Sequence, residues 1–320
     1  MLAIGVDIGG TKIAAGVVDE RGEIIDSAQR PTPAREPEAL ESAVADAVRE
    51  LRRSHDVRAV GIGAAGFVAA DRRTVVFAAN LAWRDRPLAA HVEELVDLPV
   101  VVENDANAAG WAEFLFGVAA DVATMLMMSV GSGLGGAIVV DGNLVRGAGG
   151  FAGEIAHMSA VPNGQWCGCG NRGCLEQYTA GRALVRSARS AASTGDPSAA
   201  RLLRETDGDA EGIDGPLITR LALEGDEGAR KHLEEIGHWL GRGAASIAAI
   251  LDPGMIVIGG GVSEAGDLLL EPARRTYAEH LTARAYRSLA PFAVASTGNR
   301  AGMIGAADLA RQFPAAVNDR

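Results

Sequence analysis

The sequence predicts an α/β protein built from two domains that face each other across a cleft. Strand and helix patterns alternate along most of the 320 residues, which is typical of a layered α/β fold. The length exceeds what one core of ordinary size needs and suits two domains. A strand–turn–strand segment at 6–19 aligns without a gap with a second one at 128–141, and both end in Val-Val-Asp. This repeat indicates a duplicated domain.

The first half of the chain shows strand patterns that end in glycine turns or in polar residues. Residues 36–54 place Leu40, Val44, Val48 and Leu51 on one face, which predicts a helix. The other expected elements are strands at 2–8 and 12–19, a third strand entered through 20–25, a strand at 58–66 that runs into a glycine turn, a helix at 87–96, a strand at 98–104 and a helix at 105–117.

The second half opens with the repeated hairpin and then becomes mostly helical. Its expected elements are helices at about 180–192, 215–224, 227–251 and 267–283, strands at 255–261 and 291–296, and a last helix from Ala301. Residues 194–215 have the composition of a surface loop.

The boundary between the domains is expected near Gly117–Asp121. Residues 1–118 would form a small α/β domain, with a C-terminal helix at about 301–314 packing back on it. Residues 119–300 would form a large α/β domain.

The composition excludes several classes of function. Charged residues make up 22% of the chain, the net charge is −11, and no basic run occurs, so nucleic acid and anionic membrane surfaces are not expected partners. No apolar stretch reaches the roughly 20 residues that a membrane span needs. The N-terminus MLAIGVDIGG lacks the pattern of a signal peptide. We therefore expect a cytoplasmic protein.

Three glycine-rich turns are candidates for binding phosphate groups. Glycines let backbone amides converge on a phosphate, and a lysine adds a point charge. Asp7, at the end of the first strand, is placed to orient a hydrated Mg²⁺ ion, although an ordinary hairpin turn would also explain this segment. The candidate residues are Asp7, Gly9, Gly10, Thr11 and Lys12 in the first turn, Gly131, Ser132 and Gly133 in the second, and Gly260 and Gly261 in the third.

These turns do not match the common nucleotide motifs. The GxxxxGK[ST] pattern is absent, and the GSGLGG segment at 131–136 continues into a strand rather than the helix that a dinucleotide site requires. The third turn, at 259–263, precedes a helical segment and suits a nucleotide at a helix N-terminus. Three separate turns favour a nucleotide held in a cleft between domains.

Asp105 is the candidate catalytic base. It follows an apolar strand and begins a helix, so its carboxylate could accept the proton of an attacking hydroxyl during phosphoryl transfer. An N-terminal helix cap is the alternative for Asp105, and the same ambiguity applies to Asn104.

The cysteines point to a metal site. All three, Cys167, Cys169 and Cys174, fall within eight residues, and His157 precedes them. Three thiolates and an imidazole form a closed tetrahedral set that is typical of structural zinc. The spacing excludes a redox CxxC motif; three unrelated thiols and a lone histidine are the alternative. A Glu154 carboxylate lies nearby in the sequence.

Taken together, these residues resemble the ROK family of sugar kinases and repressors. The resemblance covers essentially the whole chain and rests on DIGGTK at the start, END at 103–105, GSGLGG at 131–136, GEIAH at 153–157 and CGCGNRGCLE at 167–176. Ala156 departs from the family, where many members carry glycine. The resemblance implies an actin-like, hexokinase-type ATPase fold and a homodimer or homotetramer.

The resemblance also implies roles for individual residues. Asp105 would be the general base, and zinc would be held by His157 and the three cysteines. His157 would hold zinc with one ring nitrogen and the sugar with the other. The implied sugar ligands are Asn104, Asp105, Glu154, His157 and Glu176, with Gly66 nearby.

The family includes both enzymes and transcriptional repressors. Repressors carry a helix-turn-helix ahead of the first phosphate turn, which here begins at residue 7, so we expect an enzyme; a catalytically inactive sugar sensor is a further alternative. CLEQYTAG at 174–181 resembles the glucokinase version of this segment. We therefore expect MgATP-dependent phosphorylation of glucose, with N-acetylmannosamine or N-acetylglucosamine as alternative substrates and polyphosphate as an alternative donor.

Overall fold

The computed structural model describes residues 1–79 and 81–313, and the chain divides into two compact units. The first unit contains Met1–Asp121, Ala137–Gly153 and the segment from Ser296 onward. The second contains Val122–Gly136 and Glu154–Ala295.

Residues 137–153 group with the first unit, whereas the sequence-based division places them in the second domain. Their contacts give the reason. The Arg146 guanidinium donates to the buried Glu103 carboxylate at 2.7 Å, and the Phe151 ring packs against Phe67 with centroids 5.7 Å apart. This segment is therefore held by residues of the first unit, although it follows the second hairpin in the sequence.

Two five-stranded sheets have the same strand order. The first is β3-β2-β1-β4-β8 and the second is β11-β10-β9-β12-β13. In the first sheet β3, β2 and β1 pair antiparallel, and β1, β4 and β8 pair parallel. In the second sheet β11 and β10 pair antiparallel, and β9, β12 and β13 pair parallel. The two aligned sequence segments form β1–β2 and β9–β10, so the common order supports a duplicated domain. The strands are β1 (Leu2–Ile8), β2 (Lys12–Val18), β3 (Ile24–Pro31), β4 (Val57–Ala64), β8 (Val100–Asn104), β9 (Met125–Val130), β10 (Leu134–Val140), β11 (Asn143–Leu144), β12 (Met255–Gly259) and β13 (Phe292–Val294).

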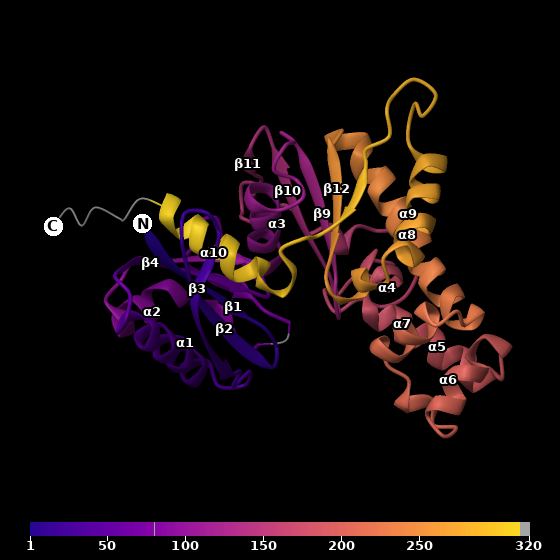
Figure 1. The fold of residues 1–320 in the computed structure, drawn as a ribbon, viewed down its shortest axis with the longest axis horizontal. Helices are drawn as coiled ribbons and strands as arrows, with labels where there is room; N and C mark the ends of the chain where they lie inside the picture. The colour runs from indigo at the N-terminus through magenta and orange to yellow at the C-terminus, as the bar shows by residue number, and fades with distance from the viewer. Residues whose placement is uncertain (80, 314–320) are drawn as a thin grey trace. The chain divides into compact units, whose positions relative to one another are not determined.

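Helices cover both faces of the first sheet (Figure 1). α1 (Pro37–Arg52) and α2 (Leu88–Val96) bury their apolar residues in the main core of this unit. α3 (Asp105–Phe116) and α10 (Ala301–Gln312) pack together on the other face. The apolar residues from which α1 was predicted, Leu40, Val44, Val48 and Leu51, are thus the residues that α1 buries.

α10 approaches the first sheet closely because glycines leave room for its backbone. A Cβ on Gly5 would lie 1.8 Å from the carbonyl oxygen of Met303, and one on Gly61 would lie 1.8 Å from that of Ala306. No side chain fits at these distances, so both strand positions require glycine. The last helix is described to Gln312, and its predicted end at 314 lies outside the described residues.

Most helices of the second unit fall between β11 and β12 in the sequence. The helices of this unit are α4 (Glu176–Thr179), α5 (Gly181–Thr194), α6 (Ala200–Glu205), α7 (Gly215–Leu223), α8 (Glu227–Leu251) and α9 (Asp267–His280). The expected loop at 194–215 was wrong in part, because it contains α6, whose Leu202 is fully buried. α9 ends at His280, three residues before its predicted end.

A small three-stranded sheet in the first unit was not predicted. It consists of β5 (Phe67–Val68), β6 (Val75–Phe77) and β7 (Arg84–Arg86). Strands this short carry no readable periodicity. Within the described part of the chain, no helix is both long and apolar enough to cross a membrane.

Candidate functional site

The ends of three parallel strands bring predicted site residues to one edge of the first sheet. Asp7 on β1 is in register with Gly63 on β4, and Ala64 is in register with Asn104 on β8. Asp105 follows as the first residue of α3. Because the carboxyl ends of parallel strands share an edge, this is where an open α/β sheet usually binds its ligands.

Asn104, and not Asp105, caps α3. The Asn104 Oδ1 accepts the Asn107 amide at 3.0 Å, and its Nδ2 donates to the carbonyl oxygen of Gly66 at 3.1 Å. The hydrogen bonds that the Asp105 carboxylate accepts are local: one comes from the Ala106 amide, at 2.9 Å, and one from its own amide. The helix cap is therefore Asn104, and the partly buried Asp105 carboxylate has no capping role.

The two carboxylates at this edge bind protons more readily than ordinary aspartates. Burial, and then the nearby Asp105 carboxylate, raises the pKa of Asp7 to about 6, although Lys12 opposes the shift. Burial also raises the pKa of Asp105 above its usual value. Poor solvation disfavours the charged form in both cases. Such a pair is suited to accepting a proton or to neighbouring a cation.

Glu103 is a site-supporting residue that the sequence analysis missed. It is 3% exposed. Its Oε1 accepts the Asn104 amide and the Asn107 Nδ2, each at 3.1 Å, and its Oε2 accepts Arg146 Nε at 2.7 Å. Arg72 Nε lies 3.6 Å from the same oxygen. A charged residue inside the apolar run Val-Val-Val-Glu was the signal that could have identified it.

The first glycine turn is open on its outer side. The Gly9 amide donates to the Lys12 carbonyl oxygen at 3.0 Å and closes the hairpin, while Thr11 accepts the Thr32 amide at 3.1 Å. Gly10, Thr11 and Lys12 are exposed, and a Cβ on Gly10 would have no neighbour within 4 Å. Packing therefore does not require glycine at position 10, which fits a backbone that a ligand approaches.

The second unit brings the four predicted metal ligands together. The ligand atoms of His157, Cys167, Cys169 and Cys174 all lie within 4.8 Å of one another. Cys167 Sγ lies 3.6 Å from His157 Nδ1, and Cys169 Sγ lies 3.6 Å from Cys174 Sγ. A tetrahedral zinc site with bonds of about 2.3 Å has edges of about 3.8 Å. The donor set and its spacing therefore fit zinc.

The pKa values of the cysteines bear on how this cluster would hold a cation. Burial, followed by hydrogen bonds from the other two thiols, raises the pKa of Cys174 to about 12. Burial likewise raises the pKa of Cys167. The pKa of Cys169 is lowered instead, because hydrogen bonds from the Asn171 amide and from the other two thiols outweigh its burial. A bound divalent ion favours the thiolate form of all three cysteines.

Two carboxylates flank this cluster, and they lie in different surroundings. Glu154 Oε2 lies 3.9 Å from Nε2 of His157, the ring nitrogen that does not face the cysteines. Glu176 Oε1 lies 3.8 Å from Cys167 Sγ. Its Oε2 accepts the amide of Leu134, in the second glycine turn, at 3.3 Å. Glu176 thus contacts both the cluster and the turn.

The two glycine turns of the second unit lie at one end of a large cavity. Gly260 has a φ of +80° and its Cβ would meet the Val130 backbone at 2.5 Å, so it requires glycine for conformation and space. Gly131 and Gly261 have open space where a side chain would be. Both line the cavity, which has a volume of about 1520 Å³.

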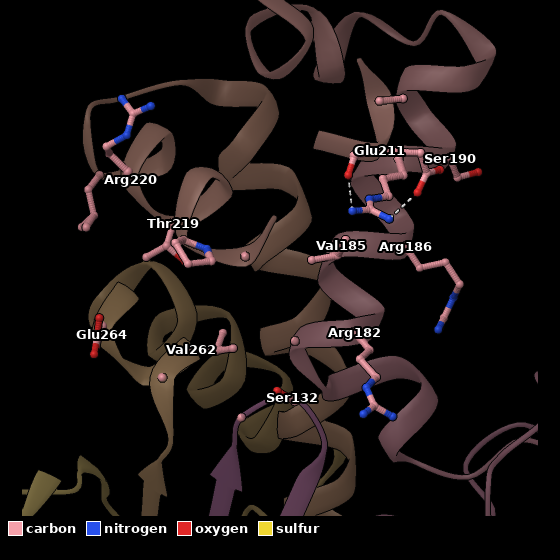
Figure 2. Close-up of a pocket in the computed structure, with 18 of the residues that line it drawn as sticks. Ser132, Arg182, Val185, Arg186, Ser190, Glu211, Thr219, Arg220, Val262 and Glu264 are labelled. Atoms are coloured by element: carbon pink, nitrogen blue, oxygen red, sulfur yellow. Dashed lines mark hydrogen bonds and ion pairs between the residues drawn. The ribbon is translucent and has the colours of Figure 1, made fainter. Parts of the chain in front are cut away.

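The cavity walls come from helices in which the sequence analysis placed no site residues. Figure 2 shows α5 on one side, with Arg182 and Val185, and Thr219 of α7 and Val262 on the other, above Ser132 of the turn. Both apolar side chains and arginines line these walls. The main lining residues that were missed are Arg182, Val185, Arg186, Ser190, Pro216, Thr219, Arg220, Leu223, Val262 and Glu264.

The ROK family model matches residues 3–313 of the chain. The chain is 48% identical to a glucokinase of Streptomyces coelicolor over 311 residues, which cover 97% of this chain and 98% of that protein. It is 35% identical to an N-acetylmannosamine kinase of Escherichia fergusonii over 264 residues, 82% of this chain and 84% of that protein.

A solved structure is similar to this fold along the whole chain. It is the ROK family glucokinase from Streptomyces griseus in complex with glucose and AMPPNP. The TM-score is 0.89 at 47% sequence identity, with 98% of this chain and all of that chain covered. With the family model, these similarities establish the actin-like ATPase fold that the sequence predicts. The chain belongs to the ROK family.

Proposed function

We propose that this protein is an ATP-dependent glucokinase that transfers the γ-phosphate of MgATP to the 6-hydroxyl of glucose. The observation that carries the proposal is the Asp105 carboxylate, which stands at the edge of the first sheet with a raised pKa and without a capping role. Similarity to glucokinases over nearly the whole chain supports the same conclusion.

Asp105 would act as the general base. Its carboxylate accepts the proton of the 6-hydroxyl as the hydroxyl oxygen bonds to the γ-phosphorus, and the bond from that phosphorus to the bridging oxygen of ADP breaks. Glu103 fixes the Asn104 backbone and side-chain network beside this base. Asn104 and Gly66 are then held for contact with the sugar.

The metal ions have separate tasks in this proposal. Asp7 and Lys12 would hold MgATP through its metal and phosphates, and Mg²⁺ supplies charge neutralisation when bound. Zinc would be held by His157 and the three cysteines, whose four positions leave no site for chemistry. The Glu154 carboxylate and His157 Nε2 are 3.9 Å apart and would bind sugar hydroxyls together.

The cavity of the second unit supports a nucleotide as the donor. Its wall has an apolar part, formed by Val185, Leu223 and Val262, against which an adenine ring can pack. The arginines of the lining can bind phosphate groups. A polyphosphate chain has no apolar part and would leave this wall exposed. We therefore infer that ATP, rather than polyphosphate, is the physiological donor, with Gly131, Ser132, Gly133, Gly260 and Gly261 near its phosphates.

A coupled ADP-release assay with MgATP and a panel of sugars tests the proposal. We expect the highest kcat/KM with glucose, compared with mannose, fructose, N-acetylmannosamine and N-acetylglucosamine. If an N-acetyl sugar gave a higher kcat/KM than glucose, that sugar would be the preferred substrate. Sugar binding without ADP release for any sugar would identify a sensor instead. Cytoplasmic location and a homo-oligomeric state stay predictions, and light scattering after gel filtration tests the latter.

A further inference from the structure

The Glu176 carboxylate lies between the metal cluster and the second glycine turn. Its Oε2 accepts the Leu134 amide at 3.3 Å, and a Cβ on Gly133 would lie 2.7 Å from that oxygen. Its Oε1 lies 3.8 Å from Cys167 Sγ. A side chain at position 133 would therefore displace this carboxylate, whatever else the turn binds.

The backbone that follows Glu176 holds the other end of the same turn. The Gly181 amide donates to the Gly131 carbonyl oxygen at 2.8 Å, and a Cβ on Gly181 would lie 2.8 Å from that oxygen. The Arg182 amide donates to the Ser132 carbonyl oxygen at 3.4 Å. A single short segment thus contacts the turn at both of its ends.

This segment starts at a ligand of the cluster. Cys174 directly precedes Leu175 and Glu176 in the chain. Leu175 is fully buried, its amide donates to the Met158 carbonyl oxygen at 2.8 Å, and a Cβ on Gly243 of α8 would meet its side chain at 2.5 Å. Because Leu175 is fully buried and lies against α8, we expect a displacement of Cys174 to move Glu176 with it.

We propose that Glu176 is a positioning residue for the second glycine turn, and that the metal cluster keeps this turn in its nucleotide-binding shape through Glu176. The inference rests on the proposed function, which assigns the turn to the phosphates of ATP. It adds a nucleotide-side role to a residue that the family resemblance assigns to the sugar. A turn that is already ordered binds phosphate at a smaller entropic cost, so loosening it weakens nucleotide binding even without sugar.

Calorimetric titration of MgADP into the zinc-loaded protein, without sugar, tests this role. Glu176→Ala should raise the Kd for MgADP about five- to tenfold, which is the effect of about one lost hydrogen bond. Its zinc content should stay at the wild-type level because Glu176 is not one of the four ligands. Glu176→Gln keeps an oxygen that accepts the Leu134 amide, and its Kd should stay within about twofold of wild type.

Glu154→Ala is the matched control, because it removes the other carboxylate beside the cluster. It should weaken glucose binding while its Kd for MgADP stays within about twofold of wild type. Removing zinc with a chelator should weaken MgADP binding at least as much as Glu176→Ala, and zinc re-addition should restore it. If Glu176→Ala does not fold, Gly181→Ala replaces it, because the added methyl displaces the Gly131 carbonyl.

Two results would overturn the inference. One is a zinc-loaded Glu176→Ala protein, or its Gly181→Ala replacement, with wild-type affinity for MgADP. The other is a Glu176→Gln protein that binds MgADP as weakly as Glu176→Ala. A wild-type protein that binds no MgADP would contradict the proposed function itself, so the two failures are distinguishable.

Discussion

The two five-stranded sheets have the same strand order but carry different insertions. Between β4 and β8 the first sheet receives the small sheet β5–β7 and α2. Between β11 and β12 the second receives the metal cluster and the helices α4 to α8. The core of a repeated fold is thus retained in both halves, and the differences lie in the connections.

This difference separates the proposed tasks. In the first sheet, the junction of its last strand with the next helix carries Asn104 and Asp105. In the second, the corresponding junction follows β13 and carries Ser296 and Thr297, which bond to the buried Glu113 instead. The same topological position therefore presents the Asp105 carboxylate, our proposed base, in one half and a structural contact in the other.

Asp105→Asn tests this contrast with the largest expected effect. We expect kcat to fall about 1000-fold, because the amide cannot accept the hydroxyl proton, while the Kd for glucose stays within about tenfold. Steady-state kinetics and glucose titration measure the two quantities. Asp56→Asn, at an exposed position, is the control and should leave both unchanged. If the kcat of Asp105→Asn stayed within tenfold of wild type, Asp105 would not be the general base.

Cys169→Ser tests whether the insertion of the second sheet depends on its metal. We expect loss of zinc by elemental analysis and a rise of about 10- to 100-fold in the KM for glucose, since the groups around the site lose their orientation. Gly168→Ala in the same loop is the control, because a Cβ there meets nothing within 4 Å. An unchanged KM in zinc-free Cys169→Ser would make the cluster incidental to sugar binding.

The chemical motifs were readable from the sequence because each is local. The cysteine cluster needs only His157 and a loop of eight residues, and the structure brings those four side chains together. Asp105 stands at a strand-to-helix junction that apolar patterns locate. The repeated hairpin predicted a duplicated domain, and the strand order that the two sheets share agrees with it.

Features that depend on distant contacts were not readable. Gly133 was assigned to phosphate binding, yet a side chain at this position would also displace Glu176, which is far along the chain. Glu103 meets Arg146 across 43 residues. The cavity walls on α5 and α7 have the composition of ordinary surface helices, and only their packing makes them the walls of a cavity.

Gly261→Val tests the cavity of the second unit. Its Cβ would meet nothing within 4 Å and the position lines the cavity, so the side chain fills ligand space without disturbing the fold. We expect the KM for ATP to rise about tenfold while the KM for glucose stays within twofold. Ala192→Val, on α5 but outside the cavity lining, should change neither value. If Gly261→Val and wild type had equal KM values for ATP, the nucleotide would not bind in this part of the cavity.

Asp7→Asn gives the smallest expected effect and concerns stability. The folded-state pKa of Asp7 is about 6, above the ordinary 3.8, so the folded protein binds a proton more tightly than the unfolded chain. Its contribution to stability is complete below pH 3.8 and is lost as the pH rises through 6. The charged carboxylate therefore destabilises the wild type near pH 8.

The substitution should remove that penalty at high pH only. We expect Asp7→Asn to stabilise the fold at pH 8 by about 1 kcal/mol, because the partial exposure of Asp7 reduces the full effect. This corresponds to a rise of about 2 °C in Tm, with no difference from wild type near pH 4. Thermal unfolding at both pH values measures it. Equal Tm values for Asp7→Asn and wild type at pH 8 would mean that the charged Asp7 carboxylate does not destabilise the fold. A higher Tm combined with weaker MgATP binding would instead assign Asp7 to function rather than to the fold.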